Sequence, residues 1–132
     1  MPGSKSTDRQ RKLYHLATQQ ILFNAELLRP GLSFREFAEK CWPVPHDYLP
    51  NRYMMMLHGC GFVDEYPSIA YEADWAAWGY DGVFEEGMVV SVESYIGEVG
   101  GPDGIRLEQQ VAIGSNGARV LSSIPLIDSF CL

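Results

Sequence analysis

The sequence is poor in basic residues and has no long apolar run. Its 132 residues include 10 Lys and Arg against 17 Asp and Glu, which gives a net charge of −7. A net-negative chain repels phosphate backbones, so we expect no nucleic-acid partner. No stretch approaches the roughly 20 apolar residues that a membrane helix needs, and the start lacks the apolar segment of a secretory signal. We therefore expect no membrane partner and a cytoplasmic location.

Cysteine is also scarce, with Cys41, Cys60 and Cys131 far apart in the chain. The odd count, the wide spacing and the lack of a CxxC pair argue against a disulfide framework and against a structural zinc site. The sequence predicts free or buried thiols in a reducing compartment.

The composition is that of a globular protein, with 46% hydrophobic and 20% charged residues. Such a chain is apolar enough to fold, unlike a disordered segment. A chain of this length is expected to form one domain over residues 1–132 with a modest core.

The first third of the chain has helical patterns. Thr7 and Gln10 form a capping-box pattern, and apolar residues then recur at three-to-four spacing, which predicts a long helix to about Leu28. Pro30 and Gly31 end it. The segment 33–36 repeats the capping pattern and predicts a shorter helix to about residue 41. Three prolines within residues 42–51 predict a loop with room for one helical turn.

The second half reads as strands. Branched residues predict strands over residues 88–95 and 105–113, and Asn116-Gly117 predicts a tight turn into a third strand over 119–121. Because helices come first and strands follow, the expected fold class is α+β.

Two carboxylates interrupt these strands. Glu93 and Glu108 lie within otherwise apolar runs, and spacing alone favours a solvated sheet face for each. A buried carboxylate would instead need a partner or a metal. His58 stands beside Gly59 and Gly61, and a histidine on such a turn is either structural or a metal ligand.

Three motifs together resemble the pita-bread metalloenzymes, which include creatinase, methionine aminopeptidase, aminopeptidase P and prolidase. They are HGCG at 58–61, EGMVVSVE at 86–93 and GIRLE at 104–108. The resemblance runs from Thr7 through Pro125. It implies a partial pita-bread fold, with long N-terminal helices packed on a curved antiparallel sheet. It further implies a divalent transition metal held by His58, Glu93 and Glu108, with Glu108 bridging two metals.

One departure from this pattern concerns the reaction. Peptidases of this type read HGxGxxxHExP, whereas here Glu65 takes the place of the second histidine and follows Asp64. This variant resembles the dimethylsulfoniopropionate lyases built on the same fold. It implies Asp64 as the catalytic base, with Tyr53 and Glu65 binding substrate. Iron is the expected metal for a lyase. The alternative is an Xaa-Pro dipeptidase or aminopeptidase, with manganese, cobalt or zinc.

The implied substrate is accordingly small, and either zwitterionic or dipeptide-like. Aromatic faces favour a sulfonium cation, and Trp75, Trp78 and Tyr80 lie close together in the sequence. Ordinary core packing is the simpler interpretation of these three aromatic residues.

A second departure concerns completeness. The family carries two aspartate ligands on a hairpin that precedes the long helix, whereas Asp8 is the only acidic residue before Glu26. The resemblance thus implies the C-terminal portion of a catalytic domain, with an incomplete metal site and no activity as an isolated chain. A non-catalytic scaffold is a further alternative. Unpaired strand edges and exposed apolar surface would favour a homodimer or a higher oligomer.

Overall fold

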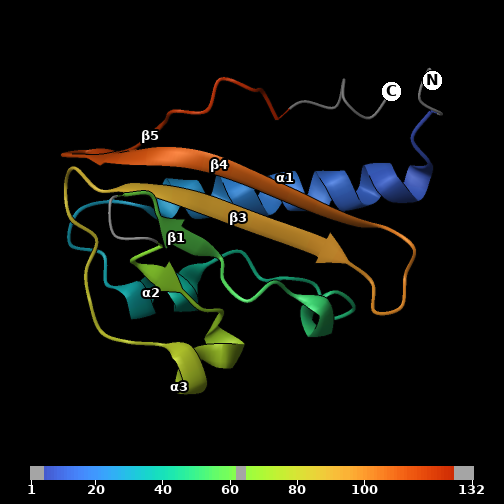
Figure 1. Ribbon diagram of the computed structural model, residues 1–132, viewed down its shortest axis with the longest axis horizontal. Coiled ribbons are helices and arrows are strands. Elements are labelled where there is room, and N and C mark those ends of the chain that lie inside the picture. The colour runs from blue at the N-terminus through green and yellow to red at the C-terminus, as the bar shows by residue number, and fades with distance from the viewer. Residues whose placement is uncertain (1–4, 62–64, 127–132) are drawn as a thin grey trace.

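The computed structural model describes residues 5–61 and 65–126, which form helices packed against one antiparallel sheet (Figure 1). The expected α+β class is confirmed. No helix in the described part of the chain is long and apolar enough to cross a membrane. The elements are α1 (Asp8–Leu27), α2 (Phe34–Lys40), η1 (Leu49–Asn51), β1 (Leu57–Gly59), β2 (Ser68–Ile69), η2 (Glu72–Asp74), α3 (Trp75–Trp78), β3 (Val89–Gly97), β4 (Gly104–Gly114) and β5 (Gly117–Val120).

The helix boundaries follow the predicted caps. The Thr7 side chain accepts a hydrogen bond from the Gln10 backbone N–H, and the Gln10 side chain accepts one from the Thr7 N–H, which completes the capping box. Ser33 caps α2 through the Glu36 N–H. The proline-rich segment is a loop that contains the single turn η1. Local sequence therefore determines where the helices begin.

The sheet has the strand order β2-β1-β3-β4-β5, and every pairing is antiparallel. β3 and β4 form a long hairpin in continuous register from Val89↔Ala112 to Gly97↔Gly104. The helix α1 runs along one face of this hairpin (Figure 1). Since side chains alternate along a strand, the opposite face of β3 and β4 is left to carry polar groups.

The core lies between α1, α2 and the sheet. It contains buried residues from each element, including Ile21 of α1, Phe37 of α2 and Val92 of β3. Phe84, which precedes β3, is fully buried and packs its ring edge-on against Phe34 and Phe37.

Buried polar contacts fix α1 on the sheet. The Ser94 hydroxyl donates to Gln20 Oε1 at 2.6 Å, and Gln20 Nε2 donates to the Tyr71 hydroxyl at 3.3 Å. Burial raises the pKa of Tyr71 to about 12, so the hydroxyl stays neutral and able to bond. These bonds satisfy groups that would otherwise be costly to bury.

Gly59 stands where β1 passes the segment that leads into β2. A Cβ added at Gly59 would lie 1.8 Å from the Tyr66 carbonyl oxygen, a backbone atom that no rotamer change can move. We expect Gly59→Ala to lower the free energy of unfolding by about 3 kcal/mol or more. Urea denaturation of the chain measures this loss.

Gly61 provides the matched control, because a Cβ there meets no atom of the described residues within 4 Å. Gly61→Ala should change the unfolding free energy by no more than about 0.5 kcal/mol. Equal stabilities of the two variants would contradict the close approach at Gly59.

Candidate metal centre and adjoining cavity

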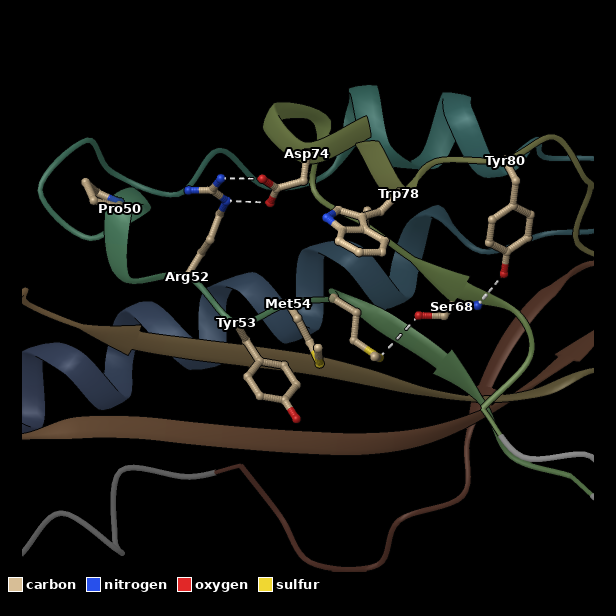
Figure 2. A pocket seen from close by; sticks show the side chains of 10 residues that line it. Pro50, Arg52, Tyr53, Met54, Ser68, Asp74, Trp78 and Tyr80 are labelled. Atoms are coloured by element: carbon tan, nitrogen blue, oxygen red, sulfur yellow. Dashed lines mark hydrogen bonds and ion pairs between the residues drawn. The ribbon is translucent and has the colours of Figure 1, made fainter. Parts of the chain in front are cut away.

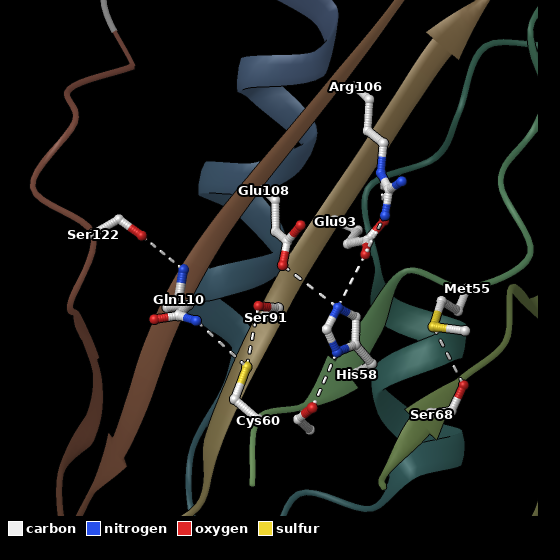
Figure 3. Close-up of polar contacts among 11 residues, drawn as sticks. Met55, His58, Cys60, Ser68, Ser91, Glu93, Arg106, Glu108, Gln110 and Ser122 are labelled. Atoms are coloured by element: carbon white, nitrogen blue, oxygen red, sulfur yellow. Dashed lines mark hydrogen bonds and ion pairs between the residues drawn. The ribbon is translucent and has the colours of Figure 1, made fainter. Parts of the chain in front are cut away.

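Strand register brings three predicted residues to one face of the sheet. His58 of β1 pairs with Ser91 of β3, and Glu93 of β3 pairs with Glu108 of β4. Ser91 and Glu93 are two residues apart, so both side chains lie on the face away from α1. Figure 3 shows His58 and the two carboxylates pointing toward one another from three neighbouring strands.

The contacts within this group are short. His58 Nε2 lies 3.0 Å from Glu93 Oε1 and 3.5 Å from Glu108 Oε1. One ligand atom from each residue lies within 4.8 Å of those of the other two, so the three side chains could hold a metal ion. Among the described residues this is the one such group.

The two carboxylates differ in burial. Glu93 is 1% exposed, so the solvated-face interpretation drawn from spacing is wrong for it. The strand β3 lies between β1 and β4, and the Arg106 side chain bonds to both oxygens of this carboxylate. These neighbours surround Glu93. Glu108 is exposed, as that interpretation expected. A carboxylate as buried as Glu93 requires positive partners.

The orientation of His58 suits a cation. Its Nδ1 lies 3.0 Å from the Gly59 carbonyl oxygen, which can only accept, so Nδ1 carries the hydrogen. In the neutral ring the Nε2 lone pair then faces two carboxylate oxygens. Either a proton on Nε2 or a metal cation between the three atoms resolves this repulsion. One imidazole with two carboxylates is a donor set that fits a divalent transition metal.

Arg106 is a functional candidate that the sequence reasoning missed. Its Nε and Nη2 donate to Glu93 Oε2 and Oε1 at 3.1 and 2.9 Å. These hydrogen bonds raise the pKa of Arg106, which keeps it charged. Its guanidinium carbon also lies 4.4 Å from the centroid of the Tyr53 ring. The sequence could have indicated Arg106 through its position two residues before Glu108, which puts both side chains on the same face of β4.

Tyr53, whose ring contacts Arg106, also lines a cavity of about 580 Å³ (Figure 2). Arg52 and Asp74 form an ion pair in the wall of this cavity, with Arg52 Nε 2.7 Å from Asp74 Oδ2. The hydrogen bond from Arg52 holds the pKa of Asp74 below its usual range. Apart from Ser68, the remaining lining is apolar or aromatic, and it includes Met54, Met55, Trp78 and Tyr80.

The aromatic residues divide between two roles. Trp75 packs against the core, as the packing interpretation expected. Trp78 is 74% exposed and borders the cavity, so core packing is wrong for it. Tyr80 accepts a hydrogen bond from the Ser68 N–H at 2.7 Å and packs edge-on against Phe34. An exposed indole beside a cavity presents a π-face that a ligand can use.

The structure describes two of the remaining predicted site residues, Tyr53 and Glu65. Tyr53 lines the cavity, and its role in binding substrate stays a prediction. Glu65 is exposed and does not line it. Asp64, the predicted base, lies outside the described residues, as does Cys131. Cys41 and Cys60 are both free thiols, as expected.

Comparison with known proteins gives consistent matches. The model of Metallopeptidase family M24 matches residues 1–115. A dimethylsulfoniopropionate lyase of Roseovarius nubinhibens is 37% identical over 83% of this chain and 24% of the relative. An Xaa-Pro dipeptidase of Pyrococcus furiosus is 29% identical over 87% of this chain and 32% of the relative. The chain thus spans about a quarter to a third of the length of these curated relatives.

Solved structures give the same fold. The prolidase from Pyrococcus furiosus superposes with a TM-score of 0.71 at 26% identity, covering 90% of this chain and 34% of that one. The Xaa-Pro dipeptidase from Bacillus anthracis superposes with a TM-score of 0.68 at 25% identity, covering 90% and 32%. The expected pita-bread fold is confirmed. This chain belongs to Metallopeptidase family M24.

Proposed function

We propose that this chain supplies part of the catalytic site of a metal-dependent dimethylsulfoniopropionate lyase, which cleaves a C–S bond to give acrylate and dimethyl sulfide. The observation that carries the proposal is the convergence of His58, Glu93 and Glu108 beside an aromatic-lined cavity. Two relatives at 37% and 35% identity are dimethylsulfoniopropionate lyases, which supports the choice of reaction.

The proposed chemistry assigns a role to each predicted residue. His58, Glu93 and Glu108 hold the divalent metal, which when bound would engage the substrate carboxylate and acidify its neighbouring C–H. Asp64 removes that proton. The C–H electron pair forms the double bond of acrylate, and the C–S pair leaves on sulfur as neutral dimethyl sulfide.

Tyr53 and Glu65 bind substrate. The aromatic faces of Tyr53 and Trp78 attract the sulfonium cation before it is discharged.

An Xaa-Pro dipeptidase is the second candidate. The same three ligands would serve it, with manganese, cobalt or zinc in place of iron. Similarity to the Pyrococcus furiosus dipeptidase and to the prolidase structures favours it. Against it stands Glu65, which occupies the position of the second histidine in peptidases. A non-catalytic scaffold is the third candidate, and stoichiometric cation binding by the chain would count against it.

Three further predictions accompany the proposal. They are an extent of 1–132 as the C-terminal portion of a catalytic domain, assembly as a homodimer or larger, and a location in the cytoplasm. Light scattering of the purified chain tests the second of these, because a well-behaved monomer would contradict it.

Segment exchange separates lyase from peptidase. This chain would replace the matching quarter of the Roseovarius nubinhibens lyase, and separately the matching third of the Pyrococcus furiosus dipeptidase. We expect the first chimera to release acrylate and dimethyl sulfide, and Asp64→Asn to lower its kcat by at least about 100-fold, as loss of a general base does. Gas chromatography of dimethyl sulfide measures the rate.

Asp47→Asn is the matched control, because Asp47 is exposed in the proline-rich loop. This substitution removes the same charge as Asp64→Asn. It should leave the rate unchanged. A folded, metal-loaded first chimera that released no acrylate, together with a second chimera that cleaved an Xaa-Pro dipeptide, would reject the lyase and support the peptidase.

A further inference from the structure

We propose that Arg106 is a positioning residue that couples cation binding at the His58, Glu93 and Glu108 group to ligand binding in the adjoining cavity, through Tyr53. The proposal rests on the proposed metal site but not on the identity of the reaction. It assigns to one side chain the link between two sites that are otherwise separate.

Arg106 fixes the plane of the Glu93 carboxylate. Its Nε and Nη2 bond to both carboxylate oxygens, a bidentate geometry that permits little rotation. His58 Nε2 approaches Glu93 Oε1 at 3.0 Å, and Figure 3 shows Arg106 and His58 on different sides of the carboxylate. The side that faces His58 and Glu108 is thereby left for a cation. Outer partners of this kind orient metal ligands and set their affinity.

Arg106 also offsets repulsion within the group. Glu93 and Glu108 lie directly opposite each other on β3 and β4, and like charges in that position destabilise a strand pair. Arg106 contributes the positive charge that makes this pairing tolerable before any metal binds. Its side chain is 48% exposed, so water competes for the guanidinium.

Tyr53 holds the guanidinium in place. The Arg106 guanidinium carbon lies 4.4 Å from the ring centroid, a cation–π distance, and the ring excludes water from one side of the planar group. Tyr53 is at the same time part of the cavity wall. A ligand that packs on Tyr53 therefore acts on Arg106, and Arg106 acts on Glu93. By linkage, a cavity ligand that changes the affinity for the cation must have its own affinity changed by the cation by the same factor.

The test measures Mn²⁺ affinity of the purified chain by electron paramagnetic resonance of the free ion. We expect Arg106→Lys to weaken binding about tenfold, because lysine keeps the charge but cannot hold both oxygens. Tyr53→Leu should weaken it about threefold, and Tyr53→Phe should not, since phenylalanine keeps the ring face. The double variant R106K/Y53L should bind no more weakly than R106K alone, because the two residues act in series.

A second readout detects the link without using affinity. With tyrosine rings labelled with carbon-13, Zn²⁺ titration should shift the Tyr53 resonance in the wild type and leave it unmoved in R106K. Arg119→Lys, at an exposed position on β5, is the matched control and should behave as wild type. Circular dichroism melting confirms that each variant is folded.

Several outcomes would overturn the proposal. Unchanged or tighter Mn²⁺ binding in R106K would show that Arg106 does not position Glu93, or that it competes with the cation. Additive losses in the double variant would make Tyr53 independent of Arg106. If the wild type bound no Mn²⁺, the proposed metal site would fail together with this coupling. Binding with no effect of R106K would refute the coupling alone.

Discussion

Glu93→Gln is expected to weaken Mn²⁺ binding by the chain by at least about 100-fold, beyond the loss that follows removal of an outer partner. The substitution keeps the shape of the side chain and removes the anionic ligand. Glu93 is 1% exposed, and both of its oxygens are bonded to Arg106. A glutamine amide would turn an N–H group toward either Arg106 or His58, which disrupts the arrangement as well as the charge. Isothermal titration calorimetry measures the affinity.

Stability gives an independent check of the same prediction. Arg106 is half exposed, so water can hydrate its guanidinium when the Glu93 carboxylate is replaced. The unfolding free energy of E93Q should therefore fall by only about 1–3 kcal/mol. Mn²⁺ should raise the melting temperature of the wild type through mass action and leave E93Q unaffected. The chelator EDTA should remove that gain.

The matched control is Glu86→Gln, at an exposed position in the segment before β3. It removes the same charge from the chain and should leave Mn²⁺ affinity and melting temperature unchanged. Equal losses in the two variants would show that bulk charge, and not a defined ligand, attracts the cation. No loss in E93Q would place the cation elsewhere.

The second large effect concerns the core. Phe84→Ala is expected to lower the unfolding free energy by about 3–5 kcal/mol, a large part of the roughly 5–15 kcal/mol available to a domain. Phe84 is fully buried, and its ring centroid lies 4.9 Å from that of Phe34 and 5.6 Å from that of Phe37. Three rings from α2 and the segment before β3 meet here, so little can move to fill the space. Urea denaturation measures the loss.

Phe23→Ala makes the same chemical change on the outer side of α1, where the side chain is 43% exposed. Alanine is also the better helix former, so we expect a change within about 1 kcal/mol. A large loss at Phe23 would mean that this side of α1 is covered by something the described residues do not include. A small loss at Phe84 would mean that the aromatic cluster can collapse around the gap.

The metal group was predictable only with the help of a resemblance. The motifs at 58–61, 86–93 and 104–108 named His58, Glu93 and Glu108, and the structure brings the three together. Spacing by itself misjudged Glu93, because an alternating strand pattern says which face a residue occupies and not what covers that face. The cover over Glu93 comes from Arg106 and His58, each on a different strand.

Local sequence by itself determined the helix starts, the loop rich in proline and the tight turn into β5. Each of these depends on groups a few residues apart, such as Thr7 with Gln10 or Asn116 with Gly117, whose preferences act without the rest of the chain. Tertiary structure alone decided the burial of Glu93, the exposure of Trp78 at the cavity and the link from Arg106 to Tyr53. Those outcomes join residues as far apart as 53 and 106, and strand register with helix packing sets such distances.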